Sequence, residues 1–281
     1  MQNEFRMDAL IPPEMARRAE EIGIKKVEMP NLSIFVLAVL AGAFIALGAI
    51  FATTVATGTA AALSFGVSKL LTGFVFCLGL VLVVIAGAEL FTGNNLIVMA
   101  WASGKVSSQS LLRNWAIVYV GNFMGAVGTA LLMFLTRQYT FAGGDVGVTA
   151  LAIANSKVNL GFTQAIVLGI LCNALVCIAV WLTFSARTTL DKIAAIIFPI
   201  TAFVAAGFEH SIANMYFVPI ALFIKTFDTT YTTSQGMELS NLTWSKFLGA
   251  NLLPVTIGNI IGGALLVAAV YWFVYLRDNT A

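Results

Sequence analysis

Two apolar stretches, residues 70–102 and 193–224, constrain the fold most strongly, because each exceeds 30 residues and carries a carboxylate inside it. A membrane-spanning helix needs about 20 residues, and a straight helix as long as these stretches would measure ~48 Å against a hydrocarbon core of ~30 Å. The carboxylates are Glu89 and Glu209, and the second is followed by His210, the only histidine of the chain. Ionisable residues at membrane depth are costly and usually functional. We therefore expect each stretch to break near its carboxylate into two half-helices.

The composition agrees with a chain that lies in a membrane. Of its residues 59% are hydrophobic and only 10% are charged, whereas an ordinary soluble domain has about 25% charged residues. Four further apolar segments fit one span each, at about 34–53, 115–136, 162–185 and 247–276. The sequence thus predicts an all-α integral membrane protein with six spans, of which the second and the fifth are broken.

Residues 1–30 form a charged arm before the six-span channel domain, residues 31–277. Within the arm, Met15, Ala19 and Ile22 share one face of a helix that can start at the Pro12-Pro13 pair. We expect this amphipathic helix to lie along the membrane interface, with a lid or a docking site as the alternative.

The orientation follows from the Lys and Arg residues. Ten of the 15 lie in the arm, in the second and fourth connections and at the C-terminal end, against five in the other connections. Because positive charge is enriched on the cytoplasmic side, both the arm and the tail, residues 278–281, are expected in the cytoplasm.

The two broken stretches share landmarks that indicate an internal repeat. Both read Gly-x-Glu with an Asn five residues after the Glu. A Gly-Asn pair then lies in the third span of each repeat, at Gly121-Asn122 and Gly258-Asn259. Spans one to three, about 31–136, match spans four to six, about 160–277. Three is an odd number, so the second copy enters the membrane inverted, a plan that places function at the interface of the repeats near the bilayer midplane.

The ends of broken helices can bind an anion. Half-helix N-termini expose backbone N–H groups and a partial positive charge. We expect Glu89 and Glu209 to accept hydrogen bonds from the unwound backbone. Four residues at these starts have types that cap helices: Thr92, Asn94, Ser211 and Asn214.

His210 invites two interpretations. It could lend and regain a proton near neutral pH, which suits a weak-acid substrate, or it could be a histidine satisfied within the protein core. The Gly121-x-x-x-Gly125 and Gly258-x-x-x-Gly262 patterns indicate close helix packing and no ligand. Apolar side chains border both breaks and suggest hydrophobic constrictions.

Several functional classes are disfavoured. The chain has no phosphate-binding Gly-Lys loop, no basic stripe for nucleic acid and no cysteine pair at metal-ligand spacing, so neither a cofactor nor a metal is expected. A membrane enzyme with Glu209 and His210 as acid and base would lack a nucleophile constellation. A pore for neutral solutes such as water or glycerol is the main alternative to an anion channel.

Two motifs carry a resemblance to a known family: Gly-Phe-Glu-His-Ser-Ile-Ala-Asn-Met at residues 207–215 and Pro-Val-Thr-Ile-Gly-Asn-Ile-Ile-Gly-Gly at residues 254–263. The chain resembles the formate–nitrite transporter family, and within it the bacterial formate channels. The resemblance covers nearly the whole chain. It implies an aquaporin-like fold, a homo-pentamer with one pore per protomer, and a prokaryotic inner-membrane location. It also implies transport of formate first, with nitrite, hydrosulfide, acetate or lactate as other small monoanions.

The same resemblance implies roles for individual residues. His210 and Thr92 would form the central polar site, which Glu209 supports, and His210 would give pH dependence. Phe76 and Phe203 would form the periplasmic constriction. The cytoplasmic constriction would consist of Leu80, Leu90 and Phe91, and the polar residues near the vestibule would be Lys157 and Asn173. The arm would move, gate the pore and contact a formate-producing lyase.

Overall fold

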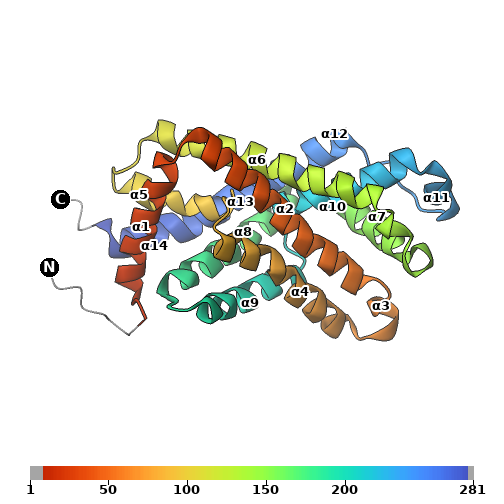
Figure 1. Ribbon diagram of the computed structural model, residues 1–281, viewed down its shortest axis with the longest axis horizontal. Coiled ribbons are helices and arrows are strands. Elements are labelled where there is room, and N and C mark those ends of the chain that lie inside the picture. The colour runs from red at the N-terminus through yellow and green to blue at the C-terminus, as the bar shows by residue number, and fades with distance from the viewer. Residues whose placement is uncertain (1–8, 278–281) are drawn as a thin grey trace.

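The computed structural model describes residues 9–277, and every regular element in this range is helical. Five of its helices are long and apolar enough to cross a membrane. They are α2 (Asn31–Ala56), α4 (Phe65–Ala86), α6 (Ser108–Leu135), α8 (Phe162–Ser185) and the continuous stretch Trp244–Tyr275. They run roughly along the long axis of the molecule (Figure 1).

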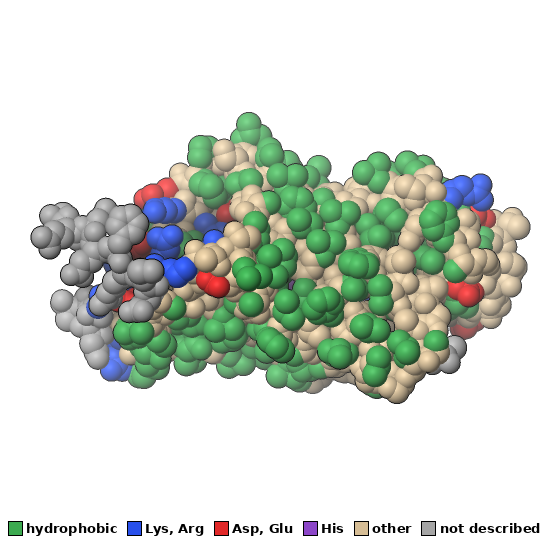
Figure 2. Space-filling view, turned by 60° about the horizontal axis from the view of Figure 1, so that its bottom comes forward, with side chains coloured by type: hydrophobic (Ala, Val, Ile, Leu, Met, Phe, Trp, Pro, Cys, Tyr) green, Lys and Arg blue, Asp and Glu red, His purple; other side chains and the backbone are tan. Residues whose placement is uncertain are grey.

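The surface agrees with this direction. Hydrophobic side chains cover the middle of the molecule, while Lys, Arg, Asp and Glu gather toward its two ends (Figure 2). Lipid tails can solvate such an apolar belt, and water can solvate the charged ends. The protein is therefore a multi-pass membrane protein.

The last span changes its helical geometry along its length. It consists of α12 (Trp244–Lys246), a π-helical segment (Phe247–Leu252), α13 (Leu253–Ile260), a second π-helical segment (Ile261–Ala269) and α14 (Val270–Tyr275). π-Helical turns inside longer helices often occur at functional sites.

The second and fifth apolar stretches break as the sequence predicts. The helix α4 ends at Gly87, whose φ of 78° only glycine adopts readily, and the chain continues through a 3₁₀ turn (Gly93–Ile97) into α5 (Val98–Ala102). In the fifth stretch α9 (Thr189–Ala205) is followed by Gly207 with a φ of 74° and then by α10 (Ser211–Phe227). The two helices have 17 residues each, so the fifth crossing is assembled from both.

The two broken stretches run in opposite directions. α4 starts near α3 (Thr59–Ala62) and runs inward, and α5 continues toward the end of the molecule where α1 (Pro12–Glu28) lies (Figure 1). α9 enters from that end, and α10 leaves toward α7 (Asp145–Val158) and α11 (Thr229–Ser234) (Figure 1). Both breaks thus lie near the centre of the molecule, which is consistent with the inverted repeat.

Glycines let the helices within each half approach closely, as their spacing indicates. A Cβ on Gly125 of α6 would lie 1.9 Å from the carbonyl oxygen of Val39 on α2. In the other half, a Cβ on Gly262 would lie 2.1 Å from the carbonyl oxygen of Ile170 on α8. No side chain fits at such distances, so both positions require glycine.

The arm does not present its apolar face to lipid. Met15, Ala16 and Ala19 of α1 are buried, and α1 packs against α5 and the 3₁₀ turn before it. Lys105 and Glu20 form an ion pair across this contact. The apolar face of α1 thus lies against the protein, and the positions of α1 relative to the membrane interface and as a lid or docking site stay predictions.

The connection between the third and fourth spans contains a helix that the sequence interpretation does not include. After two 3₁₀ turns (Gln138–Thr140 and Ala142–Gly144), α7 packs against α10. It lies at the end of the molecule opposite α1 (Figure 1). At each end a shorter helix, α1 or α7, thus packs against a broken span.

Candidate functional site: a polar centre between two vestibules

The centre of the site is a hydrogen-bonded pair that joins the two breaks. His210 Nε2 lies 2.9 Å from Thr92 Oγ1, and both residues are buried. His210 is also the N-cap of α10, because its Nδ1 accepts a hydrogen bond from the N–H of Ala213 at 3.1 Å. A nitrogen that accepts a hydrogen bond carries no proton, so neutral His210 holds its proton on Nε2 and donates it to Thr92. The Thr92 hydroxyl keeps its own proton for a further acceptor.

A small apolar cavity adjoins His210. It has a volume of about 10 Å³, enough for about one water molecule. The side chains around it are Ile45, Phe76, Leu80, Leu90, Val176, Ile200, Phe203 and His210. The rings of Phe76 and Phe203 meet edge to face with centroids 5.7 Å apart, and Phe203 lies 6.0 Å from the imidazole.

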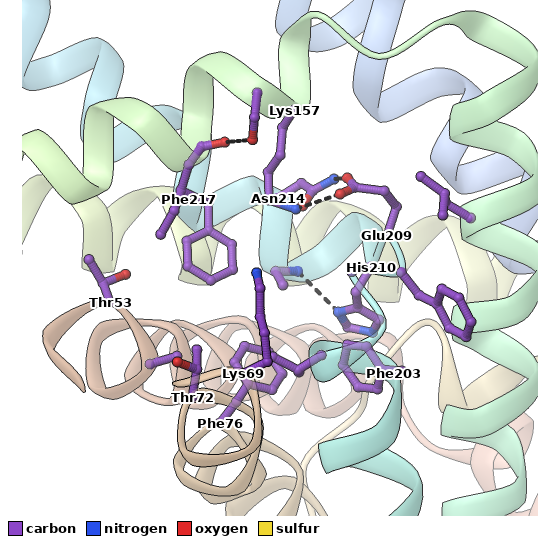
Figure 3. A pocket seen from close by; sticks show the side chains of 18 of the residues that line it. Thr53, Lys69, Thr72, Phe76, Lys157, Phe203, Glu209, His210, Asn214 and Phe217 are labelled. Atoms are coloured by element: carbon purple, nitrogen blue, oxygen red, sulfur yellow. Dashed lines mark hydrogen bonds and ion pairs between the residues drawn. The ribbon is translucent and has the colours of Figure 1, made fainter. Parts of the chain in front are cut away.

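Larger cavities lie on either side of the small one. We call the first the arm-side vestibule; it measures about 210 Å³, and its lining includes Lys26, Glu89, Leu80 and Leu90. The second, the far-side vestibule, measures about 270 Å³ (Figure 3). Its lining includes Lys69, Lys157, Glu209, His210, Phe76 and Phe203.

Shared lining residues show that the small cavity lies between the two vestibules. Leu80 and Leu90 line both the arm-side vestibule and the small cavity. Phe76, Phe203 and His210 line both the small cavity and the far-side vestibule. The structure therefore brings together five of the predicted pore residues around one small cavity, with the two leucines toward the arm-side vestibule and Phe76, Phe203 and His210 toward the far-side vestibule. The Phe91 ring instead packs edge-on against Trp115 and Tyr119 of α6 and lines none of these cavities.

In the far-side vestibule the carboxylate of Glu209 lies in a buried polar network. It accepts hydrogen bonds from Lys157 Nζ at 2.7 Å and from Asn214 Nδ2 at 2.7 Å (Figure 3). Asn214 also donates to Asn251 Oδ1 at 2.8 Å, and Asn251 donates to the backbone carbonyl of Lys157 at 3.0 Å. The network closes a ring around one ion pair.

The arm-side vestibule repeats this network. Glu89 accepts from Lys26 Nζ at 2.6 Å and from Asn94 Nδ2 at 2.7 Å. Asn94 donates to Asn114 Oδ1 at 2.9 Å, and Asn114 donates to the carbonyl of Lys26 at 3.3 Å. The lysines come from α1 and α7, so the similarity of the two halves extends to these helices.

The sequence predicts that Glu89 and Glu209 hold the unwound backbone. In the structure two buried asparagines hold it instead. In the first break, Asn122 of α6 accepts the N–H of Phe91 at 2.9 Å and donates to the carbonyls of Ala38 and Glu89 at 2.8 and 2.9 Å. Glu89 itself accepts from side chains. The expected role of the carboxylates is therefore wrong.

Asn259 of α13 does the same in the second break. Its Oδ1 accepts the N–H of Ser211 at 2.9 Å, and its Nδ2 donates to the carbonyls of Gly169 and Glu209 at 2.9 and 3.0 Å. The expected capping role of Ser211 is also wrong, because His210 caps the helix and the Ser211 hydroxyl has no hydrogen-bond partner among residues 9–277.

Asn173 lies behind Thr92 and lines neither vestibule. It is fully buried, and its Nδ2 donates to the carbonyl of Asn259 at 2.7 Å and to that of Thr92 at 3.3 Å. Asn173 thus links the backbones of the two breaks. Of the two polar residues expected near the vestibule, only Lys157 lines one.

A family model described as formate/nitrite transporter matches residues 13–273. The chain belongs to the formate/nitrite transporter family. It is 46% identical over 276 residues to the formate channel FocA of Escherichia coli strain K12. The alignment covers 97% of this chain and 96% of FocA. It is 39% identical over 282 residues to a probable formate transporter of Methanothermobacter thermautotrophicus, covering 95% of this chain and 97% of that protein.

Solved structures of the formate/nitrite transporter family agree with the fold. A pentameric formate channel with formate bound superposes with a TM-score of 0.82 at 45% identity, covering 88% of this chain and 98% of that one. An ion channel of the same family superposes with a TM-score of 0.79 at 29% identity. The predicted family membership is thereby confirmed.

Sequence reasoning missed Lys26 and four asparagines of the site. A signal for the asparagines was present, because Asn114 and Asn251 differ by 137 positions, as do Asn122 and Asn259. Lys26 had no such signal, since its partner Glu89 lies 63 residues away in a different element.

Proposed function

We propose that this protein is a channel that passes formate and related small monovalent anions through a pore in each protomer. The observation that carries the proposal is the neutral His210, hydrogen-bonded to Thr92, beside a small apolar cavity between two lysine-bearing vestibules. The similarity to formate channels over almost the full length of both chains supports it.

The small cavity argues for a small substrate. At about 10 Å³ it admits a group of about the size of a water molecule. Formate, nitrite and hydrosulfide come closest to this size, whereas acetate and lactate require the surrounding side chains to move. Formate is the substrate we favour, and nitrite or hydrosulfide is the alternative.

An anion in this path must give up its hydration, which costs several kcal/mol unless donors or a proton compensate. The Thr92 hydroxyl can donate to the anion while it accepts from His210 Nε2. A second proton on His210 would have to occupy Nδ1 and would displace the Ala213 cap. His210 is therefore a neutral donor in the structure described. Its protonation would add a positive charge to the pore and release the cap at the start of α10, and this coupling gives the pH dependence of anion flux.

Proteoliposomes test the proposal against a neutral-solute pore. We expect formate flux well above that of empty liposomes, rising as the pH falls from about 8 to 5, the range in which a histidine commonly titrates. Glycerol-driven swelling should equal the empty-liposome background. Swelling with glycerol in the absence of formate flux would establish the neutral pore instead. Parallel measurements with nitrite and hydrosulfide rank the anions.

The assembly and orientation are further parts of the proposal. We infer a homo-pentamer in a prokaryotic inner membrane, supported by the likeness to the pentameric formate channel. The positive-charge bias places the arm-side vestibule toward the cytoplasm. The outward face of α1 carries the exposed residues Arg17, Arg18, Glu21 and Lys25 and would be the contact for a formate-producing lyase. The protein is a conduit in this proposal and catalyses no reaction.

A further inference from the structure

We propose that Lys69 captures anions in the far-side vestibule and gives this vestibule a net positive charge that the arm-side vestibule lacks. The proposal rests on the proposed function, because it requires an anionic substrate. Lys69 would thereby set the rate at which anions enter the pore from the far side of the membrane.

Lys69 belongs to the beginning of α4 and lines the far-side vestibule. Its ammonium group points into the cavity from the side opposite Lys157 (Figure 3). Within the described range 9–277 no carboxylate lies at ion-pair distance from it, and its Nζ lies 5.6 Å from the centroid of the Phe65 ring. The side chain is partly exposed, so water and ions can reach it.

A comparison of charges distinguishes the vestibules. The far-side lining contains Lys69, Lys157 and Glu209, and the last two neutralise each other across 2.7 Å. The charged residues of the arm-side lining are Lys26 and Glu89, which neutralise each other across 2.6 Å. The matched networks of the two halves therefore cancel, and Lys69 leaves one positive charge on the far side.

The position of Lys69 directs a captured anion toward the constriction. Lys69, Thr72 and Phe76 all line the vestibule and lie three and four residues apart, so they share one face of α4. Phe76 is also part of the small cavity beside His210. An anion attracted by the ammonium group thus lies at the mouth of the narrow path.

The effect should depend on salt. In a water-like medium one unit charge several ångströms away raises the local concentration of a monovalent anion by about threefold. The Debye length is about 30 Å at 0.01 M ionic strength and about 3 Å at 1 M, so the gain disappears at high salt. A residue that merely stabilises the fold would not produce this dependence.

Formate flux into proteoliposomes at low and high ionic strength tests the proposal. Lys69→Gln should reduce the flux about threefold at ~10 mM and leave it unchanged at ~1 M. Lys69→Arg should behave like the unmodified protein. Lys246→Gln is the matched control: it removes the same charge from an exposed residue at the start of the last span, outside the vestibule lining, and should have no effect.

Chemical modification gives a test within one protein preparation. In Lys69→Cys, a membrane-impermeant trimethylammonioethyl thiosulfonate should restore the low-salt flux, and a sulfonatoethyl reagent should reduce it further. The native cysteines Cys77, Cys172 and Cys177 are buried, so the unmodified protein treated in the same way is the control for side reactions.

The outcomes separate the two proposals. If the unmodified protein shows no formate flux, the proposed function fails. If it conducts formate but Lys69→Gln conducts equally well at ~10 mM salt, or if both thiosulfonates act alike, the capture role of Lys69 is refuted while the channel function stands.

Discussion

Replacing Asn259 with leucine should both destabilise the protein and disturb the centre of the pore. The amide makes three buried hydrogen bonds, to the N–H of Ser211 and to the carbonyls of Gly169 and Glu209. Ser211 and Glu209 belong to the unwound backbone on either side of His210, so they have no helical partner to replace the amide. Each buried backbone group left without a partner costs about 1–3 kcal/mol, which gives a loss of ~2–6 kcal/mol for the two.

The assay combines thermal unfolding in detergent with formate flux in proteoliposomes. Asn259→Leu should unfold at a clearly lower temperature, and its flux should fall because the backbone before α10 no longer fixes His210 against Thr92. Asn259→Asp keeps an acceptor for Ser211 but loses the donor, so its effect should be intermediate. Asn241→Leu removes an exposed side-chain hydrogen bond of 2.7 Å to Asn159 and should cost less than about 0.5 kcal/mol. Unchanged stability and flux in Asn259→Leu would refute the role we give to this residue.

Four further predictions concern other parts of the path. Phe203→Ala should raise the flux of lactate about tenfold, equivalent to ~1.4 kcal/mol off the barrier, because it widens a dry constriction; unchanged selectivity would make Phe203 a packing residue. His210→Asn can still cap α10 but cannot titrate, so formate flux measured from about pH 5 to 8 should lose its pH dependence; a profile like that of the unmodified protein would assign the dependence to another group. Lys26→Met should loosen α1 by about 2 kcal/mol by leaving the buried Glu89 unpaired, and proteolysis of the arm should speed up accordingly, whereas the double variant with Glu89→Gln should recover part of the loss. The hydrogen bond from Tyr139 lowers the pKa of Asp228, so the stability that Asp228 contributes is present above its ordinary pKa and is lost as the pH falls through the lowered value. Tyr139→Phe should therefore shift acid unfolding to higher pH. An unfolding midpoint that does not move would refute the contribution of this hydrogen bond.

The main features of the fold were predictable because they follow from the length and periodicity of the apolar segments. A stretch of more than 30 apolar residues with Glu89 or Glu209 inside it cannot cross lipid as one straight helix, and the structure breaks both stretches at the preceding glycine. The opposite directions of the breaks follow from an odd number of spans per repeat. These arguments depend only on sequence neighbours and on the thickness of a bilayer.

The missed features depend on contacts between residues far apart in the chain. The apolar face of α1 suits lipid and protein equally well in sequence, and only the burial of Met15, Ala16 and Ala19 distinguishes the two. The Gly-Asn pairs at 121–122 and 258–259 were interpreted through their glycines alone. The asparagines hold the breaks through hydrogen bonds across 31 to 90 residues, which the periodicity of single helices does not reveal.

The centre of the pore arises where the two halves differ. The supporting residues correspond in both halves, each with a lysine, a glutamate and asparagines in matching hydrogen bonds. A shift of 120 positions aligns Glu89 with Glu209, and it then pairs Leu90 with His210 and Thr92 with Ile212.

Each break therefore contributes one polar side chain at a position where the other contributes an apolar one. A strictly symmetric centre would hold two histidines without threonine or two threonines without histidine. The observed pair instead gives a donor, His210 Nε2, to a hydroxyl that still has a proton to offer, Thr92 Oγ1. The repeat thus positions the two helix starts, and its departures from symmetry create the single polar point of an otherwise apolar path.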